Sequence, residues 1–305
     1  MSFTTEILSY LRSQYESATG TKMDYDSTMK SPQAQFYFRE LNDNLFRPMS
    51  AEVEKAYRSG DGNELEEKMR ALRSSSAMTY NLLGNGPVEV KADSFLFIPG
   101  EYQVSYEKQL ATIKRNPHKA NLDAYLAGEK QLVFCEMKMT EWLFNRPGVL
   151  RESYFRKELY YHPEIFDAAM ECLNRILLPN PTDHRTYYSS LTQYDALQMF
   201  KHTLAVYNFA AEDPGRIPGN IRLVNCVWHL PEKAAVSAAA MAEYHSKEAK
   251  EHQEFDVFHA SAEQMRNCFA AIGIDFDIIF VPAEKFADQF VRTPEQKRYQ
   301  ARYFG

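Results

Sequence analysis

Two carboxylates and a lysine near the middle of the chain have the types and spacing of a metal-dependent hydrolytic site. They are Asp123, Glu136 and Lys138. Asp and Glu supply the hard oxygen ligands that Mg²⁺ prefers, and a bound divalent ion neutralises a phosphodiester and lowers the pKa of water. A lysine two residues beyond the Glu can contact the attacking water or the negative charge that develops on phosphorus. These residues therefore predict a Mg²⁺ or Mn²⁺ site for phosphodiester hydrolysis.

The elements that must position these residues are two short runs of alternating apolar residues joined by a turn. Gly128 supplies the positive φ that the first position of a type II′ turn requires, so the pattern predicts a β-hairpin in which Ala127 pairs with Lys130. In that register Glu136 is the diagonal neighbour of Asp123, and all three candidate side chains point to one face.

The opposite face of the hairpin is almost wholly apolar and must be covered. Its residues are Leu122, Ala124, Leu126, Val133, Cys135 and Met137. Helices are the usual cover for such a face, so the hairpin is expected inside an α/β layer structure.

The Asp123 carboxylate, twelve intervening residues and then Glu136-Met-Lys138 resemble the core signature of the PD-(D/E)XK phosphodiesterase superfamily. The resemblance implies a restriction-endonuclease-like core, in which a central mixed β-sheet is flanked by helices, with helical additions. It also implies Mg²⁺-dependent cleavage of nucleic acid, with DNA favoured over RNA, and a metal ligand from the backbone carbonyl of Cys135. Leu122 stands where the namesake Pro would be.

Two further segments resemble parts of this superfamily. Ser75 and Asn81 lie on an expected helix before the strands, and Gln198 and Lys201 lie on the helix expected after the hairpin. The resemblance makes these four residues candidates for substrate binding. An additional acid is common in the superfamily, and the sequence leaves it open among Glu64, Glu66, Glu67 and Glu107.

Turn signals and periodicity divide the chain into an amino-terminal helical extension, 1–60, and a nuclease-like α/β domain, 61–305, with a helical insertion at about 146–188. The other predicted elements are helices over 4–17, 51–57, 63–83, 163–177, 191–209, 234–253 and 259–272, and strands over 94–98, 102–107, 220–228 and 275–281.

The net charge of −6 argues against indiscriminate coating of nucleic acid, but the charge is unevenly distributed. Residues 103–160 contain ten Lys/Arg and seven Asp/Glu, a local balance of +3. A basic rim around the hairpin is predicted from Lys108, Lys114, Arg115, Lys119, Arg146, Arg151, Arg156 and Lys157. Such a rim suits a phosphate backbone. The chain has no apolar run typical of a leader or a membrane span, so we expect a cytoplasmic protein without membrane contact.

Two other classes of function remain open on the sequence. A noncatalytic protein that binds nucleic acid or a protein partner could retain the same fold, and a helical interaction protein could carry the hairpin incidentally, with Glu136 and Lys138 as a solvated ion pair. The regular seven-residue spacing of His245, His252 and His259 places neighbours about 10.5 Å apart on a helix, too far for a shared ion. Whether the protein forms a homodimer is also open.

Overall fold

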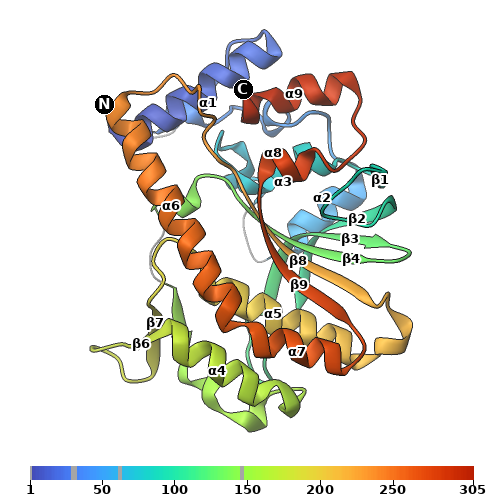
Figure 1. The fold of residues 1–305 in the computed structure, drawn as a ribbon. Helices are drawn as coiled ribbons and strands as arrows, with labels where there is room; N and C mark the ends of the chain where they lie inside the picture. Colours follow the sequence, from blue (N-terminus) through green and yellow to red (C-terminus); the bar gives the residue numbers. More distant parts are fainter. Residues whose placement is uncertain (1, 29–32, 61–63, 145–147) are drawn as a thin grey trace.

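The computed structural model describes every residue except 1, 29–32, 61–63 and 145–147. Its centre is a curled six-stranded sheet with the order β1-β2-β3-β4-β8-β9 (Figure 1). These strands are β1 Val88–Val90, β2 Gly100–Leu110, β3 Ala120–Gly128, β4 Leu132–Lys138, β8 Asn220–Val227 and β9 Asp275–Pro282. The first four pair antiparallel and β4, β8 and β9 pair parallel. The mixed sheet confirms the predicted α/β class and has the arrangement of a restriction-endonuclease-like core.

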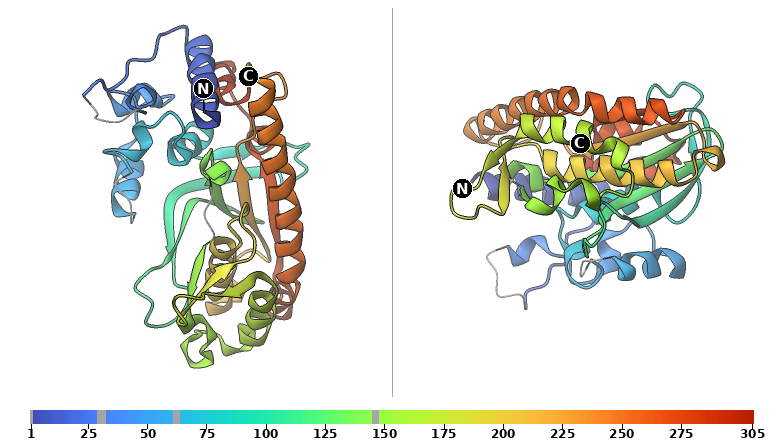
Figure 2. Two further views of the ribbon diagram at one scale, coloured as in Figure 1. Left: turned by 90° about the vertical axis from the view of Figure 1, so that its left-hand side faces the viewer. Right: turned by 90° about the horizontal axis from the view of Figure 1, so that it is seen from below.

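Helices lie on both sides of the sheet (Figure 2). They are α1 Phe3–Thr19, α2 Ala51–Ser59, α3 Ser75–Leu83, α4 Phe166–Ile176, α5 Ala196–Glu212, α6 Ala238–Ser261, α7 Glu263–Ala271, α8 Ala283–Ala287 and α9 Pro294–Phe304. One apolar cluster joins the sheet to α1, α2, α3, α8 and α9, and a second joins it to α4, α5 and α7. No helix in the described ranges combines the length and apolar character needed to cross a membrane.

The β3–β4 hairpin closes in a different register from the predicted one. Ala127 pairs with Leu132, so the predicted pairing of Ala127 with Lys130 is wrong. The shift is two residues, and because side chains alternate along a strand, an even shift leaves each of them on its predicted face. Continued toward the open end, the observed register brings Asp123 directly opposite Glu136. The two carboxylates are therefore closer neighbours than the predicted diagonal arrangement makes them.

Gly128 is required by packing and not by the turn. Its N–H donates to the carbonyl oxygen of Gln131 over 3.0 Å, so the two-residue loop consists of Glu129 and Lys130. The backbone of Gly128 has no positive φ, and the predicted type II′ turn is wrong. A Cβ at this position would lie 2.7 Å from the Tyr102 ring on β2. Glycine therefore allows an aromatic ring to lie against the end of the hairpin.

The helix predicted over 63–83 is shorter in the structure. Residue 63 lies outside the described residues, Lys68–Arg70 form a 3₁₀ turn, and the α-helix begins only at Ser75. The hydroxyl of Ser74 accepts an amide N–H of the first turn, which satisfies one of the free donors at a helix start. This cap fixes the beginning of α3, and the prediction of one continuous helix is wrong.

The strand predicted over 94–98 is a loop. The amide of Phe95 donates to the Gln289 side chain over 3.1 Å, and the amide of Phe97 donates to the Ser94 hydroxyl over 3.0 Å. Backbone donors that bind side chains in this way cannot join a β-ladder. The strand that pairs with the beginning of β2 is instead β1.

The segment after the hairpin contains both helix and strand. Besides α4 it holds β5 Val149–Arg151, β6 Leu177–Pro179 and β7 Thr186–Ser189, which form a separate sheet in the order β5-β7-β6. At the other end of the molecule α1 packs against α9 (Figure 1). The division of the chain at 61, with an insertion from about 146, stays a prediction, and both boundaries lie outside the described residues.

Candidate active site

A row of polar side chains crosses the sheet at Glu136. The residue of β8 that pairs with Glu136 is Asn225, whose side-chain amide donates to the backbone carbonyl of Glu136 over 3.4 Å. The registers of β2 with β3 and of β3 with β4 bring Glu107 opposite Asp123 and Asp123 opposite Glu136. Residues directly opposite on neighbouring strands lie side by side. The sheet therefore gathers three carboxylates from three consecutive strands.

Glu136 is buried between two partners. Its Oε1 lies 2.8 Å from Nζ of Lys138, and its Oε2 lies 2.9 Å from Nε2 of His202 on α5. Burial alone would raise the pKa of Glu136, but the charge of Lys138 and the hydrogen bond from His202 outweigh it and lower the pKa to about 2. Glu136 is therefore ionised at neutral pH, so His202 is the donor in their hydrogen bond.

Lys138 connects the hairpin to the first turn of α5. Its Nζ donates to Oε1 of Gln198 over 2.6 Å, in addition to the ion pair with Glu136. Burial would lower the pKa of Lys138, but the carboxylates of Glu136 and Asp195 raise it above its usual value. Asp195 also caps α5, since its Oδ1 accepts the amide N–H of Gln198 over 3.1 Å. The lysine is thus a fixed cation at neutral pH.

Asp123 is held against the neighbouring strand by a backbone contact. Its Oδ2 accepts the amide N–H of Met137 over 2.6 Å. Burial raises the pKa of Asp123 well above its usual value, and the negative charges of Glu136 and Glu107 raise it further. Carboxylates that oppose one another's ionisation in this way would be stabilised together by a cation placed among them.

The structure distinguishes among the acids that the sequence left open before the sheet. Glu64 lines the same cavity as Asp123, accepts a hydrogen bond from Ser76 over 2.8 Å, and forms an ion pair with Lys68 over 2.9 Å. Glu66 and Glu67 are exposed and do not line the cavity. Glu64 is therefore the candidate from this segment.

Glu107 is a second additional acid, in an unusual backbone conformation. Its φ is +53°, a left-handed value that is uncommon for a residue other than glycine and is costly to maintain. The side chain is 8% exposed and accepts a hydrogen bond from Asn121. Burial raises the pKa of Glu107 to about 7, and the charges of Glu64 and Glu136 also raise it, against the hydrogen bond from Asn121. The acids of this region therefore interact as a group.

A cavity of about 480 Å³ opens onto Glu64, Asp123 and Glu136. Among its lining residues are Glu64, Ser75, Asp123, Glu136, Lys138 and Gln198. Ser75 and Gln198 belong to the first turns of α3 and α5, so two helix amino termini face the cavity, and the positive ends of helix dipoles favour negative ligands. The three predicted catalytic residues and two of the predicted substrate-binding residues therefore meet in one place.

Other predicted site residues lie elsewhere. Asn81 is buried, and its amide donates over 2.8 Å to the carbonyl of Asn44 and to the hydroxyl of Tyr303, so it joins α3 to α9. Cys135 is a buried residue of β4 that pairs with Ala124 and does not line the cavity. Lys201 lines a neighbouring pocket.

The donor set of the cavity fits a hard divalent cation. Carboxylate oxygens are the ligands that Mg²⁺ and Mn²⁺ prefer, and Mg²⁺ commonly uses one or two of them together with several waters. Among the described residues, the acids of this cavity do not place three ligand atoms within 4.8 Å of one another. A site of this kind therefore fits an ion that keeps part of its water shell.

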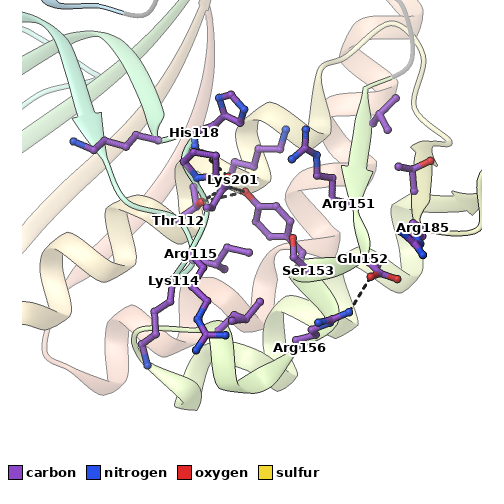
Figure 3. A pocket seen from close by; sticks show the side chains of 18 of the residues that line it. Thr112, Lys114, Arg115, His118, Arg151, Glu152, Ser153, Arg156, Arg185 and Lys201 are labelled. Atoms are coloured by element: carbon purple, nitrogen blue, oxygen red, sulfur yellow. Dashed lines mark hydrogen bonds and ion pairs between the residues drawn. The ribbon is translucent and has the colours of Figure 1, made fainter.

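A basic pocket of about 770 Å³ lies beside α5, which contributes Lys201 to its lining (Figure 3). Its basic residues are Lys114, Arg115, His118, Lys119, Arg151, Arg156, Arg185 and Lys201. Lys201 follows Gln198 by three positions, about 4.5 Å along the helix axis, so the pocket adjoins the carboxylate cavity. Burial lowers the pKa of Lys201, and the charge of Arg151 lowers it further, against the carboxylate of Asp195.

The pocket contains most of the basic rim that the sequence predicts. Lys114, Arg115, Lys119, Arg151 and Arg156 all line it. The predicted rim residues Lys108 and Lys157 do not line it, and Arg146 lies outside the described residues. A concave surface with this charge suits a phosphate-bearing chain.

Sequence reasoning missed the part that His202 and Asn225 play. His202 stands four positions after Gln198, which placed it on the correct side of α5 but gave it no partner. Its contact with Glu136 depends on how α5 packs on the sheet, and the contact of Asn225 depends on the pairing of β4 with β8. Neither contact has a local sequence signal.

Glu107→Gln is expected to stabilise the fold in a pH-dependent way. Because the folded-state pKa of Glu107 is about 7 and its usual value is 4.5, its contribution to stability is present below 4.5 and is lost as the pH rises through 7. The glutamine variant should therefore exceed the parent by up to about 3 kcal/mol in free energy of unfolding at pH 8, and by little at pH 4. Urea unfolding with EDTA present measures this.

The matched control is Glu101→Gln, which makes the same change at an exposed position of β2. It should behave like the parent at both pH values. A Glu107→Gln variant that is no more stable than the parent at pH 8 would show that this carboxylate is not buried as described.

Comparison with known proteins identifies one family. A family model described as "Restriction Endonuclease associating with ARP" matches residues 9–254, well over half of the chain. No curated protein matches the chain, and no solved structure matches it.

Proposed function

Because the chain belongs to the family described as Restriction Endonuclease associating with ARP, we propose that it is a metal-dependent nuclease whose catalytic residues are Asp123, Glu136 and Lys138. The observation that carries the proposal is the meeting of these three side chains in one cavity, on the two strands of one hairpin. The motif that they form supports assignment to the PD-(D/E)XK superfamily.

Asp123 and Glu136 would hold a Mg²⁺ or Mn²⁺ ion, with Glu64 and Glu107 nearby. When bound, such an ion neutralises the phosphate, lowers the pKa of water and stabilises the leaving oxygen. The chain orients the two carboxylates through the Met137 amide and through His202, which we propose as a positioning residue. The backbone carbonyl of Cys135 as a further ligand is carried over from the resemblance to the superfamily.

Lys138 would act as a cation and hydrogen-bond donor. Its raised pKa keeps it protonated at neutral pH, so it cannot serve as the base that removes a proton from water. A fixed ammonium beside Glu136 can orient the attacking water or stabilise the charge that develops on phosphorus. Gln198, bound to Nζ, holds the lysine in place and would reach the substrate from the first turn of α5.

The substrate that we propose is nucleic acid, with DNA favoured over RNA. The basic pocket beside α5 supports a polyanionic ligand, because sequence-independent binding to nucleic acid is largely neutralisation of phosphates by Lys and Arg. Lys201 lies in that pocket and Ser75 lies in the carboxylate cavity, so each could bind a different phosphate of one strand. Asn81 remains in the proposal only as a residue that supports α3.

The proposal also includes the oligomeric state of the protein and its cellular compartment. Two catalytic sites can cut both strands of a duplex in one binding event, and we propose that a homodimer supplies them. All four cysteines are free thiols, which is typical of a reducing compartment, so we place the protein in the cytoplasm.

The test is cleavage of a substrate panel by the purified chain. Supercoiled plasmid, linear duplex DNA, single-stranded DNA and single-stranded RNA are each incubated with Mg²⁺, Mn²⁺ or EDTA. We expect cleavage of DNA with either ion and none with EDTA. Preferential cleavage of RNA would correct the substrate, and binding of nucleic acid without cleavage of any member would favour the noncatalytic alternative.

Loss of two cations from the basic pocket is expected to weaken binding. In a chain inactivated by Glu136→Gln, adding Arg151→Ala and Lys201→Ala should lower affinity for a labelled DNA duplex about tenfold and reduce the salt slope by about 2. Fluorescence anisotropy over a range of salt concentrations measures both. Lys130→Ala, in the exposed hairpin loop, is the control for loss of charge. Equal weakening by the control would contradict a role for the pocket.

A further inference from the structure

A second cluster of metal-ligating side chains lies outside the carboxylate cavity. His229 follows the end of β8, and Glu248 and His252 lie one turn apart on α6, the long helix at the side of the sheet in Figure 1. One ligand atom from each of the three residues lies within 4.8 Å of the others, and this is the only group of its kind among the described residues. The end of β8 and the helix that follows it in the chain thus bring two imidazoles and a carboxylate together.

One distance within the cluster already matches the spacing of ligand atoms around a tetrahedral ion. A metal with ligands at about 2.1 Å in tetrahedral geometry holds its ligand atoms about 3.4 Å apart. Nδ1 of His229 lies 3.3 Å from Oε1 of Glu248. The rings of His229 and His252 are 5.5 Å apart between centroids, and His252 is exposed, so its ring can approach the other two.

A neighbouring carboxylate supplies an independent observation. Glu251 is 2% exposed, and its Oε2 has no hydrogen-bond partner. That atom lies 3.9 Å from Nε2 of His229, which is also buried without a partner. Unpaired buried polar groups are costly, so each of these atoms calls for a partner that a small movement would provide.

We propose that His229, Glu248 and His252 bind a divalent transition-metal ion of the zinc class. Two imidazoles and one carboxylate are a ligand set typical of such ions, with a fourth position for water. With the ion on Nδ1, the proton of the His229 ring resides on Nε2, and shortening the 3.9 Å separation to hydrogen-bond distance makes Nε2 a donor to Glu251. The carboxylate then orients the histidine, as partners of metal-bound imidazoles commonly do.

The ion ties α6 to the end of β8. Phe280 of β9 and Trp142 pack against the His229 ring, with centroids 6.0 and 5.7 Å away, and fix its orientation. Glu251 also lines a small cavity of about 30 Å³ together with Glu136 and Lys138. A metal at this site therefore orders one wall of this small cavity without contacting the residues proposed for catalysis.

Metal uptake by the full-length chain tests the site without any assay of cleavage. After treatment with a chelator and its removal, the parent is titrated with Co²⁺, whose absorption reports tetrahedral coordination, and with Zn²⁺ in equilibrium dialysis. We expect about one ion per chain in the parent and in Asp123→Asn, and at least a tenfold loss of affinity in His252→Ala and Glu248→Gln. The side chain of His252 is exposed, so its removal leaves the fold intact.

His184→Ala is the control, because His184 is an exposed histidine outside the group. It should bind as the parent does. Absence of uptake by the parent, or uptake that His252→Ala leaves unchanged, would overturn the proposal. A loss confined to Asp123→Asn would also overturn it, since the ion would then occupy the carboxylate cavity. These outcomes are independent of whether the protein cleaves nucleic acid.

Discussion

Glu136→Gln is expected to lower the rate of nucleic-acid cleavage by about 10³-fold, equivalent to about 4 kcal/mol of transition-state stabilisation. Glutamine keeps the size of the side chain and one oxygen that can accept the hydrogen bond from His202. It removes the negative charge that faces Lys138 and that would hold a divalent ion. Single-turnover cleavage with enzyme in excess measures the chemical step.

The control for this variant is Glu129→Gln, the same substitution in the exposed loop of the same hairpin. It should cleave at the parent rate. Thermal unfolding of both variants establishes that they are folded. A folded Glu136→Gln protein that cleaves within a factor of about three of the parent would exclude Glu136 from the metal site.

Lys138→Met is expected to lower the rate by about 10²-fold or more, since one preorganised charge in such a site contributes about 3 kcal/mol. Methionine retains much of the unbranched side chain and loses the ammonium that contacts Glu136 and Gln198. The measurement is again single-turnover cleavage, at a Mg²⁺ concentration that saturates the parent. Because both proposed ligands remain, the concentration of Mg²⁺ for half-maximal rate should change little.

Measuring the stability of the Lys138→Met variant against pH separates the catalytic role of Lys138 from its structural role. Lys138 helps to hold the pKa of Glu136 near 2, so the carboxylate contributes stability above its usual pKa of 4.5, and this is lost as the pH falls through 2. Removing the ammonium should therefore destabilise the fold at pH 7 and have little effect near pH 2. A rate loss that disappears when the variant is assayed fully folded would contradict a catalytic role.

The carboxylate pair could be predicted from the sequence because side chains alternate between the two faces of a strand. A pairing error of an even number of residues therefore leaves every side chain on its predicted face. The predicted turn at Gly128 was wrong by two residues in pairing, yet Asp123 and Glu136 still meet. An odd error would have separated them. The error arose because position 128 needs glycine to make room for the Tyr102 ring on β2. That is a packing requirement between strands, and a local turn signal does not contain it.

The additional acid and the contacts of Glu136 could not be predicted for a related reason. Glu64, Glu66 and Glu67 are equally good candidates on the sequence. The packing of the segment before α3 on the sheet directs Glu64 to the cavity and leaves the other two outside it. Glu107 adopts a left-handed backbone that no pattern of residue types indicates. The meeting of His229 with α6 likewise depends on how α6 lies against the end of β8. Contacts between elements, unlike faces within one element, require the folded chain.

The measurement that tests the central claim most directly is DNA cleavage as a function of Mg²⁺ concentration, for the parent and for Asp123→Asn side by side. The account predicts no cleavage in EDTA, a saturable increase in the parent's rate with Mg²⁺, and little or no cleavage by the folded variant at the same concentrations. Cleavage by the parent in EDTA, or an identical Mg²⁺ dependence in the two proteins, would contradict a metal-dependent nuclease site at Asp123 and Glu136.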